Sequence, residues 1–326
     1  MHVRENALKE WLAQTTKQQD FILTPLAGDA SFRRYFRMQY NNLSYVVMDA
    51  PPGKEDLKPF IHIAQVLGQA QVHSPQIHAM DLQQGFLLLS DLGDQLLLNV
   101  LQDQTVDHYY QQAIRTLFKI QSCSVNDPDL AAFDSTFMLK EMNLCNEWFL
   151  KGYLGLTLQQ DENQLVQHAM EWVASEVAKQ PLTFIHRDYH SRNLMLLNDE
   201  AEPSLGVIDF QDAMRGPITY DLVSLLKDCY ISWPRAQVLE WVTFFHTQNK
   251  LAQTHSLAEF IRAFDLCGLQ RHLKVLGVFS RLHLRDNKPG YLKDLPLVLK
   301  YVLECTETYE ELHPLFNFLQ MRVYLP

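Results

Sequence analysis

The chain has 326 residues, of which 47% are apolar and 20% charged, so it can bury a large core and is not expected to be disordered. Its 28 Lys and Arg and 38 Asp and Glu residues give a net charge of −10, which argues against a broad surface for nucleic acid or an anionic membrane. No apolar run approaches the roughly 20 residues of a membrane span, and the polar N-terminal stretch is unlike a signal peptide. Five widely spaced cysteines without a Cys-x-x-Cys pair are typical of reduced thiols. We therefore expect a cytoplasmic monomer with no nucleic-acid or membrane partner.

A polar helix is predicted over the first 20 residues, and strand-like runs follow it in quick succession. Asn41 and Asn42 separate two of these runs and favour a hairpin turn, because Asn tolerates positive φ. The predicted elements of this part are strands at 21–26, 32–40, 43–50, 77–81 and 86–92 and a helix at 57–71.

The rest of the chain is predicted to be mainly helical. Helices are expected at 105–120, 137–150 and 164–179, a cluster of short strands at 182–210, and further helices from 221 onward. This pattern predicts an α+β fold with a small β-rich N-lobe over 1–92 and a larger helical C-lobe over 93–326. The connection between the lobes falls near 90–94, and a cleft between lobes is a common place for a small-molecule site.

Polar residues with catalytic potential follow the short strands of the second half. The segment 184–197 reads as apolar strand, polar loop and apolar strand, and a further apolar strand leads to Asp209. These strand ends can bring Asp188, Asn193 and Asp209 together. Mg²⁺ prefers oxygen ligands and usually takes one or two carboxylates plus substrate phosphates, so Asn193 and Asp209 are candidate metal ligands. Asp188 would then orient a substrate hydroxyl and accept its proton.

The spacing His186-x-Asp188-x-x-x-x-Asn193, followed by Asp209, resembles the catalytic loop and metal-binding aspartate of the protein-kinase-like superfamily. The short interval between Asp209 and Tyr220 resembles the aminoglycoside phosphotransferase branch, which acts on small molecules. This resemblance implies a bilobal kinase-like fold that uses ATP and Mg²⁺.

Three further segments are similar to the bacterial anomeric sugar kinases that phosphorylate N-acetylmuramate and N-acetylglucosamine at C1. They lie at 26–37, 209–222 and 268–277. The resemblance covers nearly the whole chain, and it implies an amino-sugar acceptor and a role in peptidoglycan recycling.

The predicted nucleotide site departs from the kinase pattern. Met48 stands about where a strand Lys usually meets the phosphates, and the helix at 57–71 offers no mid-helix Glu to pair with it. We expect Arg33, Arg34 or Arg37 to supply the positive charge instead, and the turn at 28–31 to offer backbone N–H groups. Backbone groups at the lobe connection would face the adenine ring. The predicted nucleotide-binding residues are Gly28, Ser31, Arg33, Arg34, Leu89, Ser90 and Asp91.

Other residues are expected to support the loop or to line the acceptor site. His186 and Arg187 would fix the catalytic loop, with Arg187 in a structural ion pair. Asp212 is expected in a turn or near the metal ion, and Asp221 is expected to cap the following helix and steady the loop. The candidate acceptor contacts are Glu141, Asn146 and Trp148.

Two alternatives remain open at this stage. One is a kinase for another acceptor, such as an aminoglycoside or a different amino sugar. The other is a nucleotide-binding pseudokinase, which the missing strand Lys favours and the complete set of Asp188, Asn193 and Asp209 opposes.

Overall fold

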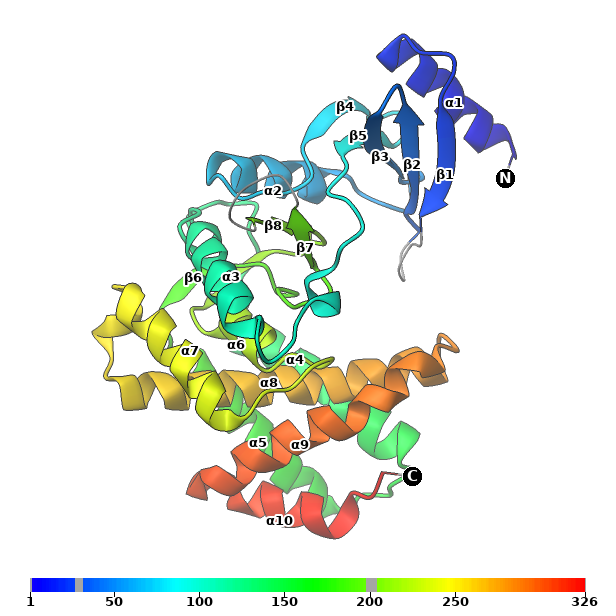
Figure 1. The fold of residues 1–326 in the computed structure, drawn as a ribbon. Helices are drawn as coiled ribbons and strands as arrows, with labels where there is room; N and C mark the ends of the chain where they lie inside the picture. The colour runs from blue at the N-terminus through cyan, green and yellow to red at the C-terminus, as the bar shows by residue number, and fades with distance from the viewer. Residues whose placement is uncertain (1, 27–31, 198–203, 326) are drawn as a thin grey trace. The chain divides into compact units, whose positions relative to one another are not determined.

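The structure is a computed structural model that describes residues 2–26, 32–197 and 204–325. They form two compact units (Figure 1), the first comprising residues up to Asn99 together with Asn193–Asp212, and the second Val100–Arg192 together with residues from Ala213 onward. The first unit holds a small antiparallel sheet and the second is mostly helical, so the predicted α+β class is confirmed.

The first unit is built on a five-stranded antiparallel sheet with strand order β1-β2-β3-β5-β4. Helix α1 packs on one face of this sheet, where Leu8 and Leu12 meet Phe36, Met38 and other buried side chains. These residues alternate along β2 with polar ones, as a half-buried strand requires. The elements of this part are α1 (His2–Thr16), β1 (Ile22–Leu26), β2 (Arg34–Tyr40), β3 (Leu43–Asp49), α2 (Lys58–Gln69), β4 (Ile77–Asp81) and β5 (Phe86–Ser90).

A hairpin from much later in the chain completes the first unit. Strands β7 (Leu194–Leu197) and β8 (Ser204–Val207) pair with each other. The N–H of Val207 donates to the carbonyl of His73 over 2.7 Å, and the Phe210 ring lies 4.9 Å from the Phe60 ring of α2. The sequence predicts a single boundary between the lobes, after residue 92. It did not predict that residues 193–212 group with the first unit.

The second unit is organised around the long helix α8, which contacts most of the other helices of this unit (Figure 1). A capping box starts α8, because the Ser256 hydroxyl accepts from the Glu259 N–H while the Glu259 carboxylate accepts from the Ser256 N–H. The elements of this unit are α3 (Val106–Gln121), α4 (Ser135–Leu144), η2 (Cys145–Tyr153), α5 (Gln160–Val177), β6 (Leu182–Ile185), β9 (Met214–Pro217), α6 (Tyr220–Leu226), α7 (Arg235–Gln248), α8 (Leu257–Leu284), α9 (Leu295–Thr308) and α10 (His313–Arg322).

Two predicted elements differ from the structure. The helix expected at 137–150 changes to π-helical hydrogen bonding at Cys145, beside a close approach of α8 at Gly277. The strand expected at 86–92 ends at Ser90, because the Asp91 carboxylate accepts the Gly93 N–H and turns the chain. Among the described residues, no helix has the length and apolar character needed to cross a membrane.

Candidate active site

The predicted catalytic loop follows strand β6 of the second unit. This strand is buried along most of its length and pairs with β9, so it delivers a polar loop directly from an apolar interior. His186 is fully buried, and its Nδ1 accepts the backbone N–H of Asp188 over 3.3 Å. Arg187 has a φ of 77°, a left-handed conformation that is uncommon for a non-glycine residue and often marks functional sites.

A buried carboxylate holds the loop in this conformation. Asp221, near the start of α6, accepts the N–H of His186 over 2.7 Å and the N–H of Arg187 over 3.0 Å. Burial raises the pKa of Asp221 to about 7, although both N–H groups lower it. Asp221 therefore ties the predicted catalytic loop to α6 through two backbone groups. The expected helix cap is wrong, because Thr219 holds the N-cap position and the Asp221 carboxylate is used by the loop.

Positive charge surrounds Asp188. Burial by itself raises the pKa of this carboxyl, but the charges of Lys274, Arg271 and Arg187 are the main opposing influences and hold the pKa well below the ordinary range. Asp188 is thus an ionised carboxylate at neutral pH, in a setting that favours its negative charge.

The cations near Asp188 are themselves anchored. Arg187 pairs with Glu141 of α4 over 2.6 Å, and its guanidinium lies over the Phe137 ring. Lys274 of α8 lies 3.8 Å from the same carboxylate and donates to the Tyr220 hydroxyl over 3.3 Å. Glu141, a predicted acceptor contact, therefore neutralises cations beside Asp188 in this structure.

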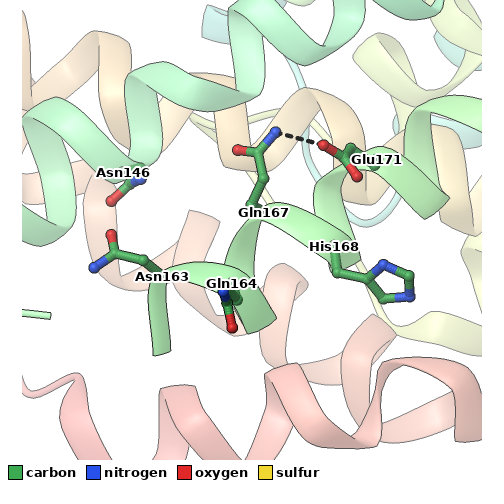
Figure 2. A pocket seen from close by; sticks show the side chains of 6 residues that line it. All are labelled: Asn146, Asn163, Gln164, Gln167, His168 and Glu171. Carbon is green, nitrogen blue, oxygen red and sulfur yellow. Dashed lines mark hydrogen bonds between the residues drawn. The ribbon is translucent and has the colours of Figure 1, made fainter. Parts of the chain in front are cut away.

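Asn146 lines a cavity of about 660 Å³ in the second unit. The other lining residues come from α5, and Figure 2 shows the side chains of Asn146 and Asn163 pointing toward one another. Asn146 Oδ1 is buried and has no hydrogen-bond partner among the described residues. Trp148 is half-buried on η2. The lining residues are Asn146, Asn163, Gln164, Gln167, His168 and Glu171.

The two predicted metal ligands meet within the first unit. Asn193 and Asp209 flank the β7–β8 hairpin, and Asn193 Nδ2 lies 3.4 Å from Asp209 Oδ2. Asp209 has a φ of 64° and is exposed, and its other oxygen accepts from Gln211 over 2.9 Å. One carboxylate and one amide oxygen at an exposed position suit a hard cation that keeps several waters. Asp212 is exposed at the end of this segment.

Of the three neighbouring arginines, Arg33 acts on the same tyrosine as Asp209 does. Arg33 pairs with Glu55 over 3.1 Å, and both side chains are mostly buried. Burial raises the pKa of the Tyr35 hydroxyl, Arg33 lowers it, and the charges of Asp209 and Glu55 raise it further. The charges of Arg33, Asp209 and Glu55 are therefore all close enough to affect the ionisation of Tyr35.

Arg34 and Arg37 have other partners. Arg34 binds the fully buried Asp49, which also pairs with Arg4 of α1. Arg37 donates to Asp91 over 2.7 Å and to Asp94 over 2.8 Å. These two arginines link strands and loops of the first unit to each other.

The remaining predicted nucleotide residues lie in or near β5. Leu89 is buried in the sheet, and Ser90 donates its N–H to the Gln76 carbonyl over 2.9 Å. The Asp91 side chain is engaged by Arg37, so any contact of Asp91 with a base would involve its backbone. Met48 is fully buried on β3. Gly28 and Ser31 lie outside the described residues.

The sequence analysis did not single out Glu55 and Tyr35, which interact with Arg33 in the structure. Arg33 and Tyr35 are two positions apart and so share one face of an extended chain, whereas Arg34 shares the opposite face with the buried Phe36. That alternation was available in the sequence. Glu55 lies just before α2, outside the helix in which kinases usually carry the acidic partner of the strand Lys.

A family model and curated relatives both identify this chain as similar to phosphotransferases. The family model described as "Phosphotransferase enzyme family" matches residues 22–260. An N-acetylmuramate/N-acetylglucosamine kinase from Pseudomonas putida is 43% identical over 285 residues, which cover 86% of this chain and 83% of that protein. A protein of the same name from Neisseria meningitidis serogroup B is 38% identical and covers 97% of this chain and 95% of its own length.

Solved structures agree on the fold. The ADP-bound aminoglycoside phosphotransferase APH(2'')-Ib superposes with a TM-score of 0.61 at 16% identity, covering 92% of this chain and 98% of that one. Choline kinase LicA from Streptococcus pneumoniae superposes with a TM-score of 0.65 at 11% identity, covering 95% of this chain and all of that one. The fold is therefore protein-kinase-like, as predicted.

Proposed function

Because the chain belongs to the phosphotransferase enzyme family, we propose that it transfers the terminal phosphoryl group of ATP to the anomeric hydroxyl of N-acetylmuramate and N-acetylglucosamine. The names of its relatives support these acceptors. The observation that carries the proposal is the Asp188 carboxylate, kept ionised by surrounding cations on a loop that Asp221 fixes. The product would enter peptidoglycan recycling, as the family resemblance implies.

Asp188 orients the acceptor hydroxyl and takes its proton. A carboxylate with a lowered pKa is a weak base, so its main contribution is alignment of the attacking oxygen. Phosphoryl transfer depends mostly on positioning and on neutralising charge, so a weak base is sufficient. The anomeric hydroxyl is also more acidic than an ordinary alcohol.

Asn193 and Asp209 provide the oxygen atoms that would hold Mg²⁺. When bound, the ion neutralises charge on the phosphate oxygens. Asp188 and Asn193 are five positions apart in the chain, which suits their use on one phosphoryl group. Arg33, paired with Glu55, takes the part of the absent strand Lys, because its positive charge lies in the same group of side chains as Asp209.

Phosphorus NMR of the purified chain with ATP, Mg²⁺ and either sugar tests this function. We expect ADP and a new phosphate signal that couples to the anomeric proton of each sugar. ATP that stays unchanged with both sugars would contradict the proposal. Turnover with an aminoglycoside or another amino sugar would then assign a different acceptor, and the absence of turnover with all of them would indicate a pseudokinase.

A further inference from the structure

A buried carboxylate joins the end of the catalytic loop to Tyr230. Asp228 accepts the N–H of Ser191 over 3.0 Å and also its hydroxyl, and its second oxygen accepts the N–H of Tyr230 over 3.0 Å. Ser191 and Asp228 are almost completely buried. The loop and Tyr230 are therefore held at a fixed spacing by hydrogen bonds out of contact with water.

Arg192, the residue after Ser191, lies against that tyrosine. Its guanidinium carbon is 3.7 Å from the centre of the Tyr230 ring, and the His190 ring meets the same tyrosine edge-on. Within the described parts of the chain, Arg192 makes no hydrogen bond or ion pair, whereas Arg187 of the same loop is paired with Glu141. Arg192 thus offers a planar, half-buried set of donors that is already oriented.

The surroundings of Arg192 suit a sugar acid. Phe279 lies 6.2 Å from Tyr230 and 5.1 Å from Tyr291, which extends the aromatic surface. Asp294 Oδ2 is buried and lacks a hydrogen-bond partner among the described residues, so it offers an acceptor to a sugar hydroxyl. Apolar rings with a few well-placed polar groups are typical of small-molecule sites.

We propose that Arg192 binds the carboxylate of N-acetylmuramate and thereby sets the preference of this chain for that sugar over N-acetylglucosamine, which lacks the carboxylate. This inference rests on the proposed function. N-acetylmuramate carries its carboxylate on a lactyl ether at O3, two ring carbons from the reacting C1 hydroxyl. Its partner must therefore lie near Asp188 without occupying the same position, and Arg192 follows Asp188 by four residues.

A nucleotide phosphate is the other anion that a free guanidinium could bind. The aromatic neighbours of Arg192 are Tyr230 and, beyond it, Phe279 and Tyr291, all in the helical unit. Apolar rings suit the faces of a sugar ring better than they suit a phosphate. We therefore assign Arg192 to the acceptor.

The test compares steady-state kinetics of wild type, Arg192→Gln and Arg192→Lys on both sugars at saturating ATP. Arg192→Gln should lower kcat/KM for N-acetylmuramate about 10- to 100-fold, mainly through KM, since a bidentate charge-assisted pair is lost. The value for N-acetylglucosamine should stay within about threefold of wild type. Arg192→Lys should give an intermediate kcat/KM for N-acetylmuramate, because it keeps the charge but loses the bidentate hydrogen-bond geometry of the guanidinium. Arg285→Gln, at an exposed arginine that pairs with Asp286, is the matched control and should change neither value.

A second measurement requires no variant. Wild-type enzyme should use the methyl ester of N-acetylmuramate, which has no negative charge, about as poorly as the Gln variant uses the acid. Unchanged kinetics with the ester and with Arg192→Gln would overturn the inference. An equal loss for both sugars with a raised KM for ATP would also overturn it, in favour of phosphate binding. Wild-type enzyme inactive on both sugars would remove the proposed function, and this inference with it.

Discussion

At the scale of single residues, partners distinguish three neighbouring arginines that the sequence presents as equivalent. Arg34 compensates a carboxylate with no exposure to solvent, and Arg37 joins β2 to the segment after β5. Arg33 pairs with Glu55 in the group that includes Tyr35 and Asp209. This placement is why we proposed Arg33, and not Arg34 or Arg37, for the nucleotide phosphates.

We predict that Arg33→Ala raises KM for ATP at least about 10-fold, since a charge-assisted contact to phosphate is lost, and also lowers stability, because Glu55 remains mostly buried without this partner. Arg34→Ala should leave KM for ATP within about threefold of wild type. It should lower the free energy of unfolding by about 1–3 kcal/mol, because Asp49 remains buried with one partner fewer. Parallel ATP kinetics and thermal melts of the two variants check this. A normal KM for ATP in Arg33→Ala would disprove the role of Arg33.

Asp188→Asn should abolish turnover and leave nucleotide binding within about threefold of wild type. The amide keeps the shape of the side chain but can neither take a proton nor carry the charge that the neighbouring cations favour. Calorimetric titration with ADP, beside an ATP-consumption assay, separates the two effects. Retention of more than about a tenth of wild-type kcat would refute the assignment.

At the scale of elements, α8 approaches the junction of α4 and η2 so closely that only glycine fits. A Cβ on Gly277 would lie 2.2 Å from the Leu144 carbonyl carbon and 2.5 Å from the Cys145 nitrogen. Both are backbone atoms, so neither can move aside as a side chain could. A Cβ on Gly268, in the same helix, would have no neighbour closer than 3.5 Å.

Gly277→Ala should therefore lower the free energy of unfolding by at least about 2 kcal/mol through overpacking. Gly268→Ala is the matched control, and it should be neutral or stabilising by up to about 1 kcal/mol, because Ala is the better helix former. Denaturant unfolding of both variants measures the difference. Equal stabilities would show that the helices can separate at little cost.

The loop between β6 and α6 couples stability to pH. Asp221 has its pKa raised to about 7 by burial, so the folded chain retains a proton that the unfolded chain releases at lower pH. Raising the pH from about 4 to 7 therefore lowers the free energy of unfolding through Asp221. Above pH 7 this contribution no longer changes.

Asp221→Asn removes this titration along with one acceptor for the loop. The variant should have a lower free energy of unfolding than wild type at pH 4.5. This difference between the two proteins should shrink by roughly 1–3 kcal/mol by pH 7.5. Urea unfolding of both proteins at several pH values measures the gap. A gap that is constant across this range would contradict the raised pKa.

At the scale of the whole molecule, the chain forms two compact units. Of the residues proposed for the reaction, Asn193, Asp209 and Arg33 belong to the first unit, and Asp188 and Arg192 belong to the second. The hairpin at 193–212 belongs to the first unit although it follows the catalytic loop in sequence. Ligands of the first unit should therefore be detectable by their effect on stability, without turnover.

ADP with Mg²⁺ at about 100 times its dissociation constant should stabilise the fold by about 2.7 kcal/mol. Removing the metal with EDTA should abolish most of this gain, and Asp209→Asn should gain little in either condition. Asp20→Asn, at an exposed carboxylate of the same unit, should behave like wild type. Thermal melts measure the effect, and an equal gain with and without metal would exclude Asp209 as a metal ligand.

Local pattern was sufficient for much of this molecule. Alternation and turn residues placed all five strands of the first sheet within a few residues, because these features act between neighbours in the chain. The strand–loop–strand pattern likewise brought Asn193 and Asp209 to one hairpin, since β7 and β8 pair directly. The π-helical turn at Cys145 was missed, because nothing in the local period of 137–150 distinguishes it from an ordinary helix.

The sequence by itself determined the fold class, the order of the elements and the chemistry-bearing loop, because residue type and spacing suffice for these. Only the tertiary structure decided how the charges are distributed. It assigned Arg34 to Asp49, Arg33 to Glu55 and Glu141 to Arg187, and it left Arg192 stacked on Tyr230 without an ion pair among the described residues. The reason is physical: a charged side chain acquires its role from the burial and charge of groups distant in sequence, and chain pattern does not encode those distances.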